Sequence, residues 1–215
     1  MGLTMAADGS ETGELLQQVR AGDQASLAKL FALHRARLRT MVRLRLDRRL
    51  QGRVDPSDVL QEAFVDLAKR AGEYVANPSM PFFLWLRLLT GQRLTAIHRQ
   101  HLGAQMRDAG MEVSLHRGAL PQATSGSLAA QLMGHLTSPT QAAVRAEMQL
   151  RLQEALNGMD PLDREVLVLR HFEELSNNET AAALGLQKAA ASNRYVRALK
   201  RLKDILAGMP GFFER

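Results

Sequence analysis

The chain has 215 residues, of which 46% are hydrophobic and 5% are aromatic, and it contains no cysteine. At roughly 100–200 residues per domain, this length allows one domain or two small ones. The low aromatic content argues against an all-β fold, and the lack of cysteine excludes disulfides, thiolate metal sites and cysteine nucleophiles. The 28 Lys and Arg against 22 Asp and Glu give a net charge of +6, which favours nucleic acid or an anionic membrane surface as partner.

The first third of the chain is predicted to be helical after a short leader. Residues 1–11 lack the basic and apolar blocks of a signal peptide, and we expect them to be disordered. From Thr12 onward apolar residues recur at three- and four-residue steps, and Asp23 is placed to cap the second helix. The stretch 35–53 carries eight arginines and one acidic residue, Asp47. It predicts a basic amphipathic helix or helix pair, whose basic face is either solvated or turned toward phosphates.

Two more helices are predicted before residue 102. Asp55, with a proline directly after it, is a strong helix start, and this helix is expected to run to about Ala71. Residues 72–81 contain Gly72, the pair Asn77-Pro78 and Pro81, and these turn-forming residues predict a loop. The next helix should cover residues 82–101. Within it lies Trp85, the sole tryptophan, which we expect to be a buried anchor.

The composition then changes, which indicates a boundary between two domains. Residues 103–139 are rich in Gly, Ser, Thr, Ala and Gln and predict a flexible linker, with a transient helix near 128–136. Four short helices are predicted after it. The expected fold is all-α, with two small helical domains at 12–102 and 140–208 joined by this linker, and with residues 209–215 as a tail.

The last two predicted helices, 177–184 and about 187–206, are joined by a short turn at Gly185. Two short helices with such a turn are typical of the helix-turn-helix, although a solvated helical hairpin fits the same pattern. Residues 187–203 contain no acidic side chain. Early residues of the second helix would reach base edges and later basic residues would meet phosphates. The expected DNA-binding residues are Gln187, Lys188, Ser192, Asn193, Arg194, Arg197, Lys200 and Arg201.

Three segments of the chain resemble bacterial sigma factors. Residues 160–176, DPLDREVLVLRHFEELS, together with the turn ALGL at 183–186, resemble region 4, which reads the −35 promoter element. Residues 58–64, DVLQEAF, resemble the Asp-x-x-Gln-Glu-x-Phe signature of region 2.2, which docks on the clamp helices of the polymerase β′ subunit. Residues 82–99 are similar to regions 2.3 and 2.4, which melt and read the −10 element. This layout is that of the extracytoplasmic-function group.

The resemblance implies a sigma-region-2-like bundle, a region-4-like helix-turn-helix domain, and a role in promoter recognition. The implied partners are core RNA polymerase, through its β′ clamp helices and β flap, promoter DNA, and an anti-sigma factor of the kind that many family members have. A cytoplasmic protein without a cofactor is implied, monomeric when free. The implied polymerase-binding residues are Asp58, Gln61, Glu62 and Asp66. The implied −10 residues are Arg87, Gln92, Arg93, His98 and Arg99.

Two segments depart from the family pattern. Gln92 and Ala96 stand where the −10 helix often has Asn and Asp. Residues 189–194, AAASNR, stand where the recognition helix commonly has Gly-Thr-Val-Lys-Ser-Arg. The promoter sequence therefore cannot be copied from other members.

Other classes of function were compared with this one. The six histidines show no metal-ligand spacing, and neither a Gly-rich phosphate loop nor a nucleophile elbow occurs, so an enzyme is not expected. A run of roughly 18 apolar residues, as a membrane-spanning helix needs, is also missing. A helix-turn-helix regulator that acts without polymerase would leave residues 58–62 and 35–53 without a role. Peripheral membrane binding through 35–53 is a further alternative.

Overall fold

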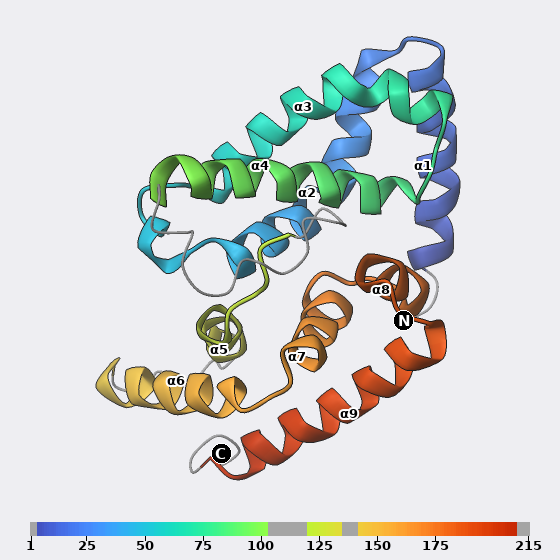
Figure 1. Ribbon diagram of the computed structural model, residues 1–215. Coiled ribbons are helices and arrows are strands. Elements are labelled where there is room, and N and C mark those ends of the chain that lie inside the picture. Colours follow the sequence, from blue (N-terminus) through green and yellow to red (C-terminus); the bar gives the residue numbers. More distant parts are fainter. Residues whose placement is uncertain (1–3, 103–119, 135–141, 210–215) are drawn as a thin grey trace. The chain divides into compact units, whose positions relative to one another are not determined.

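The computed structural model describes residues 4–102, 120–134 and 142–209 (Figure 1). Its helices form two compact units. The first comprises residues 1–42 and 46–120, and the second comprises residues 43–45 and 121–215. All regular secondary structure within the described ranges is helical. The prediction of an all-α fold with two helical domains is confirmed.

The described residues of the first unit form four long helices and one short 3-10 turn. Aspartates cap two of them as predicted: Asp23 accepts a hydrogen bond from the backbone of Ala25 at 2.9 Å, and Asp55 accepts one from Ser57 at 2.7 Å. These caps satisfy backbone donors that have no partner inside the helix. The elements are α1 (Thr4–Arg20), α2 (Gln24–Arg45), η1 (Arg48–Leu50), α3 (Pro56–Ala76) and α4 (Phe82–Leu102).

Two boundaries differ from the predictions. Residues 4–11, expected within a disordered leader, belong to α1, because Met, Ala and Glu favour helix even where no apolar stripe marks one. Helix α3 continues past Ala71 to Ala76. Its last turns are held by Tyr74, which is buried and donates a hydrogen bond to the Met80 carbonyl at 2.9 Å. Tertiary packing thus outweighs the helix-destabilising effect of Gly72 in α3.

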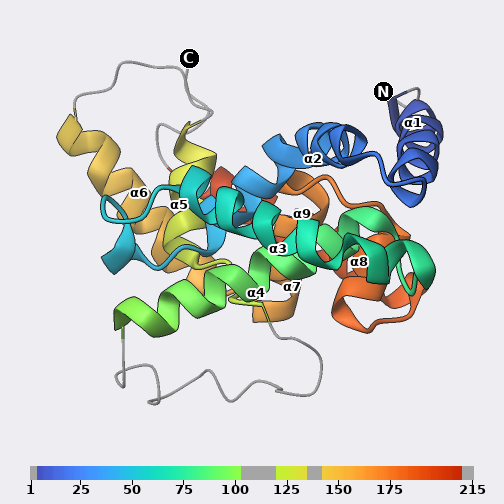
Figure 2. The ribbon, with the colours of Figure 1, turned by 90° about the horizontal axis from the view of Figure 1, so that it is seen from above.

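The core of the first unit lies between α3 and α4, which pack against each other (Figures 1 and 2). Trp85 is buried and stacks on Tyr74 with ring centroids 4.6 Å apart, which confirms its prediction as an anchor. Phe31 of α2 meets Phe64 of α3 edge to face at 5.2 Å. Consecutive residues of α4 from Phe82 onward are buried, so this helix is covered on most sides rather than along one stripe.

The arginine-rich stretch forms the end of α2 and η1, as a helix pair. Its arginines are not all on a solvated face. The Arg37 guanidinium lies 3.6 Å from the centroid of the Phe83 ring, in a cation–π contact. Arg45 is only 1% exposed. Both side chains therefore take part in packing, and the full burial of Arg45 was not expected.

Five α-helices and a π-helical turn are formed by the part of the second unit that the structure describes. They are α5 (Ser125–Gly134), α6 (Ala142–Asn157), α7 (Pro161–Leu167), η4 (Val168–Phe172), α8 (Asn177–Leu184) and α9 (Lys188–Ala207). Helix α5 lies within the expected linker, where only a transient helix near 128–136 was predicted. It packs along α6, and its Leu128 and Met133 join Leu152 and Leu156 in one core. The expected linker residues 103–119 and 135–141 lie outside the described residues.

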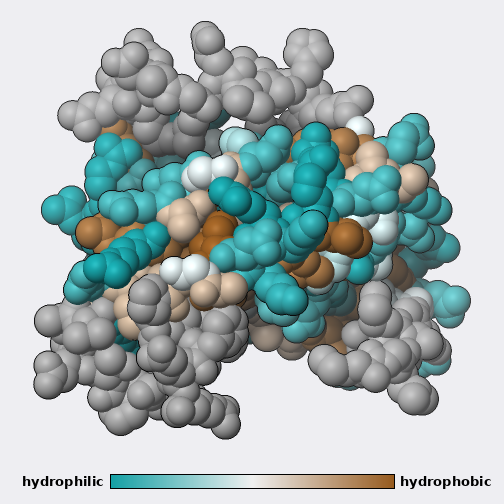
Figure 3. Space-filling view, turned by 90° about the horizontal axis from the view of Figure 1, so that it is seen from below, coloured by the Kyte–Doolittle hydropathy of each residue, from teal (hydrophilic) through white to brown (hydrophobic). Residues whose placement is uncertain are grey.

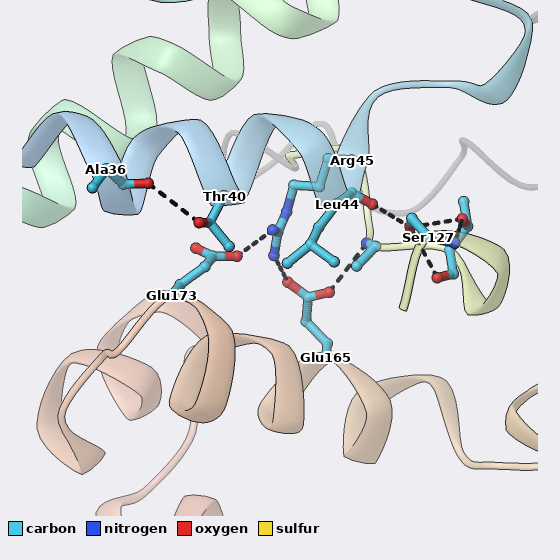
Figure 4. Close-up of polar contacts among 9 residues, drawn as sticks. Ala36, Thr40, Leu44, Arg45, Ser127, Glu165 and Glu173 are labelled. Carbon is cyan, nitrogen blue, oxygen red and sulfur yellow. Dashed lines mark hydrogen bonds and ion pairs between the residues drawn. The ribbon is translucent and has the colours of Figure 1, made fainter. Parts of the chain in front are cut away.

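The second unit also takes in the last three residues of α2, through a polar cluster (Figure 4). The Arg45 guanidinium is paired with the carboxylates of Glu165 and Glu173. Beside it, Ser127 Oγ donates to the Leu44 carbonyl at 2.6 Å. Glu173 and Arg45 are almost fully buried, and a buried carboxylate without such a partner is strongly destabilising. The Arg45 guanidinium therefore partly neutralises the carboxylates of Glu165 and Glu173, which would destabilise the fold if they were buried without a cation.

Candidate nucleic-acid interface

Local hydrogen bonds define the turn between α8 and α9. Ser176 and Glu179 form a capping box at the start of α8, with Glu179 N donating to Ser176 Oγ at 3.2 Å and Ser176 N donating to the Glu179 carboxylate at 2.8 Å. Gly185 ends α8 at φ 65°, a left-handed conformation that favours glycine. Asn177 Nδ2 then donates to the Lys188 carbonyl at 2.9 Å. The start of α9 is thereby tied to the start of α8.

Helix α9 has a buried side and a strongly basic outer side. Ala191, Ala198 and Ile205 are buried against the rest of the unit. Among the candidate DNA-binding residues, Arg194 is the one that is partly buried. The exposed ones are Gln187, Lys188, Ser192, Asn193, Arg197, Lys200 and Arg201. Seven of the eight candidates are thus accessible on one element.

Two apolar residues on the outer side of α9 were not predicted as site residues. Val196 is 63% exposed and Leu199 is 37% exposed. Hydrophilic residues predominate on the face of the molecule seen from below, where α9 lies, and apolar residues show between them (Figure 3). The sequence could have indicated Val196, because it lies four residues after Ser192 and three after Asn193. This spacing places it on the same side of the helix as these two candidates.

A carboxylate from α7 holds two of the candidate arginines. Asp163 Oδ2 accepts from Arg197 Nε at 2.6 Å, and its Oδ1 accepts from Arg197 Nη2 at 2.8 Å and from Arg194 Nη1 at 2.6 Å. The Asp163 side chain is 7% exposed, against 28% for Arg194 and 61% for Arg197. The hydrogen bonds from Arg197 lower the pKa of Asp163, and burial, which opposes them, is outweighed. Asp163 is therefore ionised at neutral pH.

In the first unit, α3 presents an exposed acidic and amide face. Asp58, Gln61 and Glu62 are all exposed at the three- and four-residue spacing that places side chains on one side of a helix. Val65 continues this face and is 50% exposed. Asp66, the fourth predicted polymerase-binding residue, is partly buried. The face could pair with a basic partner helix that also carries an apolar side chain.

Asp66 is turned toward α4 instead. It accepts hydrogen bonds from Arg93 Nε at 2.9 Å and Arg93 Nη2 at 2.5 Å. Glu62 lies 3.4 Å from Arg93 Nη1. Gln92, the neighbouring −10 candidate, accepts from Arg70 Nη1 at 3.4 Å. Asp66 and Glu62, which were expected to contact polymerase, are thus paired with Arg93, which was expected to contact the −10 element.

Two of the five −10 candidates are buried, and this corrects the expectation. Arg87 is 7% exposed and His98 is 2% exposed. His98 Nε2 accepts a hydrogen bond from the backbone N–H of Asp47 at 3.2 Å, and burial lowers the pKa of this imidazole. Both side chains belong to the packing of α4 and are not available to DNA. Arg99 and Gln92 are exposed and Arg93 is partly exposed, so these three are retained as candidates.

Metal ligands and membrane segments were sought in the described ranges. They contain no group of three or more His, Asp or Glu side chains that could hold a metal ion. The helices within these same ranges are also too short or too polar to cross a bilayer.

Comparison with known proteins connects this geometry to a family. Residues 149–202 match the family model of sigma-70, region 4. The ECF RNA polymerase sigma factor SigD of Mycobacterium tuberculosis is 26% identical over 201 residues, which cover 94% of this chain and 86% of SigD. The RNA polymerase sigma-E factor of Streptomyces coelicolor is 44% identical over 55 residues, 26% of this chain and 31% of that protein.

A solved structure shares the fold. The structure of CnrH in complex with the cytosolic domain of CnrY aligns with a TM-score of 0.54 at 22% identity, covering 92% of this chain and 97% of CnrH. The chain is therefore similar to extracytoplasmic-function sigma factors along most of its length, and to sigma-70 region 4 over residues 149–202. These similarities support a role in transcription initiation.

Proposed function

We propose that this protein binds core RNA polymerase through the exposed face of α3 and recognises a promoter with α4 and α9. The observation that supports this most is the separation of two unlike surfaces on two compact units. One is an acidic and amide face on a helix with the region 2.2 signature. The other is the basic outer face of residues 187–203, which contain no acidic side chain, on the second helix of a helix-turn-helix.

For the −35 element, α9 lies in the major groove of duplex DNA. Gln187 and Asn193, near its start, can each make two hydrogen bonds to an adenine edge. Lys200 and Arg201, further along, bind phosphates and set the register of the protein on the duplex. Val196 lies between these groups and adds an apolar contact surface.

For the −10 element, the exposed polar residues of α4 are the proposed contacts. Arg93 and Arg99 bind the backbone of the promoter strand, and Gln92 lies beside Arg93. The polymerase contacts are Asp58, Gln61 and Glu62, which can pair with cations of the β′ clamp helices. The β flap, and an anti-sigma factor that competes with polymerase, complete the proposed set of partners.

Binding to polymerase is tested with a charge reversal on α3. The full chain should co-elute with core RNA polymerase at low ionic strength, and Glu62→Lys should weaken this binding. Glu73→Lys is the matched control, because it makes the same change on the same helix at an exposed site outside the acidic face. Equal weakening by both variants, or none by Glu62→Lys, would contradict the assignment.

A second experiment separates a sigma factor from a regulator that acts alone. Promoter opening by the full chain should require core polymerase, whereas a regulator would bind a duplex site tightly without it. Arg197→Ala should reduce promoter affinity by about 1–3 kcal/mol if one base contact is lost. Tight duplex binding without polymerase, together with no effect of polymerase on promoter opening, would favour the regulator.

A further inference from the structure

The ion pairs between α7 and α9 leave Arg197 with a defined set of free donors. A guanidinium has five N–H groups, and the two hydrogen bonds to Asp163 use one on Nε and one on Nη2. Three donors remain, including both on Nη1. Since the side chain is 61% exposed, these donors are accessible. Two of them are enough for the bidentate contact that arginine makes with guanine O6 and N7.

The Asp163 carboxylate also neutralises part of the positive charge of Arg194 and Arg197. Arg194 donates through Nη1 to Asp163 at 2.6 Å, and its side chain is only 28% exposed. The one negative charge of Asp163 is thus shared between two positive charges on the outer helix, and Asp160 lies 3.5 Å from Arg194 as well. Phosphate attraction, which is independent of sequence, falls when positive charge is neutralised. The pair also fixes the Arg197 side chain, so less rotamer entropy is lost when it contacts a base.

We propose that Asp163 is a positioning residue of the −35 interface. It presents Arg197 for base contact and withholds the charge of Arg194 from phosphates, so that binding by α9 depends more on DNA sequence and less on charge. This inference rests on the proposed function of α9. Its site is distinct from the expected DNA-binding residues, because Asp163 lies on α7 and does not itself touch DNA.

The test compares Asp163→Asn with Asp160→Asn in the full chain bound to core polymerase. Both variants remove one negative charge from the same turn of the protein. Asp160 is 52% exposed and lies 3.5 Å from Arg194, and asparagine preserves its role as helix cap. The probes are duplexes enriched from a random −35 library by wild-type holoenzyme, and a scrambled duplex of the same composition.

For Asp163→Asn we expect the preference for enriched over scrambled duplex to fall about tenfold, the size of one bidentate base contact. Affinity for the scrambled duplex should rise. Asp160→Asn should leave the preference unchanged. A role of Asp163 in folding alone would lower both affinities by the same factor, and so would overturn the proposal. Equal preferences for the two variants would overturn it as well.

Two further variants keep the test decisive if Asp163→Asn folds poorly. Asp163→Glu retains the charge and should restore at least part of the preference. Arg197→Lys retains the positive charge but cannot form the bidentate geometry. It should lose the preference about as much as Asp163→Asn, and adding Asp163→Asn to it should cause no further loss. Additive losses would overturn the proposal. If wild type enriches no sequence although it binds core polymerase, the proposed −35 function fails as well.

Discussion

At the scale of single residues, Val196 shows what an exposed apolar side chain can contribute to a basic surface. It lies on the outer side of α9 between Asn193 and Lys200, and more than half of it is accessible. In the major groove, thymine alone presents a methyl group, and apolar side chains recognise it by contact. A valine in this position therefore predicts a preference for thymine at one base of the promoter.

We expect Val196→Ala to weaken promoter binding about fourfold, since one of the two methyl groups that it removes would be buried against thymine, at roughly 0.8 kcal/mol per group. Replacing the contacted thymine with deoxyuridine removes only its methyl group and should weaken wild type to a similar extent. The variant should then be insensitive to that replacement. Leu33→Ala is the control, because this leucine is also an exposed apolar residue but lies on α2, outside the proposed binding surfaces. If the replacement of thymine with deoxyuridine weakens binding by Val196→Ala as much as binding by wild type, Val196 does not contact the methyl group.

Asp163 also makes stability depend on pH. Because hydrogen bonds from Arg197 hold its pKa below the ordinary value of 3.8, the folded state favours the ionised form. Such a group contributes stability above its unfolded pKa, and this contribution is lost as the pH falls through the lower, folded pKa. The difference in unfolding free energy between wild type and Asp163→Asn should be constant near neutral pH and shrink below about pH 4. Urea unfolding across this range measures it; a constant difference would contradict the pairing.

At the scale of elements, α5 shows how a weakly patterned segment becomes part of a domain. Its ten residues include two glycines and two serines, and its sequence predicts little helix on its own. Leu128 and Ala129 are nevertheless completely buried, because the side of α6 that carries Leu152 and Leu156 needs apolar cover. The second unit therefore begins before the region 4 match and contains a helix that was expected only as a transient one within the linker.

We expect Leu128→Ala to destabilise the second unit by about 2–5 kcal/mol, the range for truncating a fully buried leucine. Leu150→Ala, on the exposed side of α6, should change stability by less than about 0.5 kcal/mol. Chemical unfolding of both full-length variants measures the difference. If residues 125–134 were a mobile linker, the two substitutions would have equally small effects.

At the scale of the whole molecule, the net charge of +6 is unevenly distributed. Residues 187–203 contain no acid, while the exposed face of α3 carries Asp58 and Glu62. One surface thus attracts polyanions and another attracts basic groups. Binding to DNA releases counterions in proportion to the phosphates contacted, so promoter affinity should fall steeply with salt.

Lys200→Gln should reduce the slope of log affinity against log salt by about 1 and weaken binding to all sequences alike. Lys69→Gln, which removes an exposed lysine from α3, should leave the slope of −35 duplex binding unchanged. Titrations of the holoenzyme with duplex DNA at several salt concentrations measure both slopes. A sequence-dependent loss for Lys200→Gln would instead indicate contact with a base.

Much of the candidate site could be predicted because its determinants are local. The caps at Asp23, Asp55 and Ser176, and the left-handed turn at Gly185, depend on residues within a few positions of each other. Exposure of the outer side of α9 follows from its 3.6-residue period. The partner of Arg197, by contrast, is 34 residues away. No local pattern indicates which acidic residue will pair with it.

The sequence by itself determined the all-α class, the helix starts, the helix-turn-helix and the basic surface, because each depends on backbone capping or on the period of one helix. The tertiary structure alone decided that α5 completes the second core, that Arg87 and His98 are buried, and that acidic residues of α3 and α7 bind the arginines of α4 and α9. These outcomes depend on which segments pack together, and burial and long-range ion pairing exist only after that packing has formed.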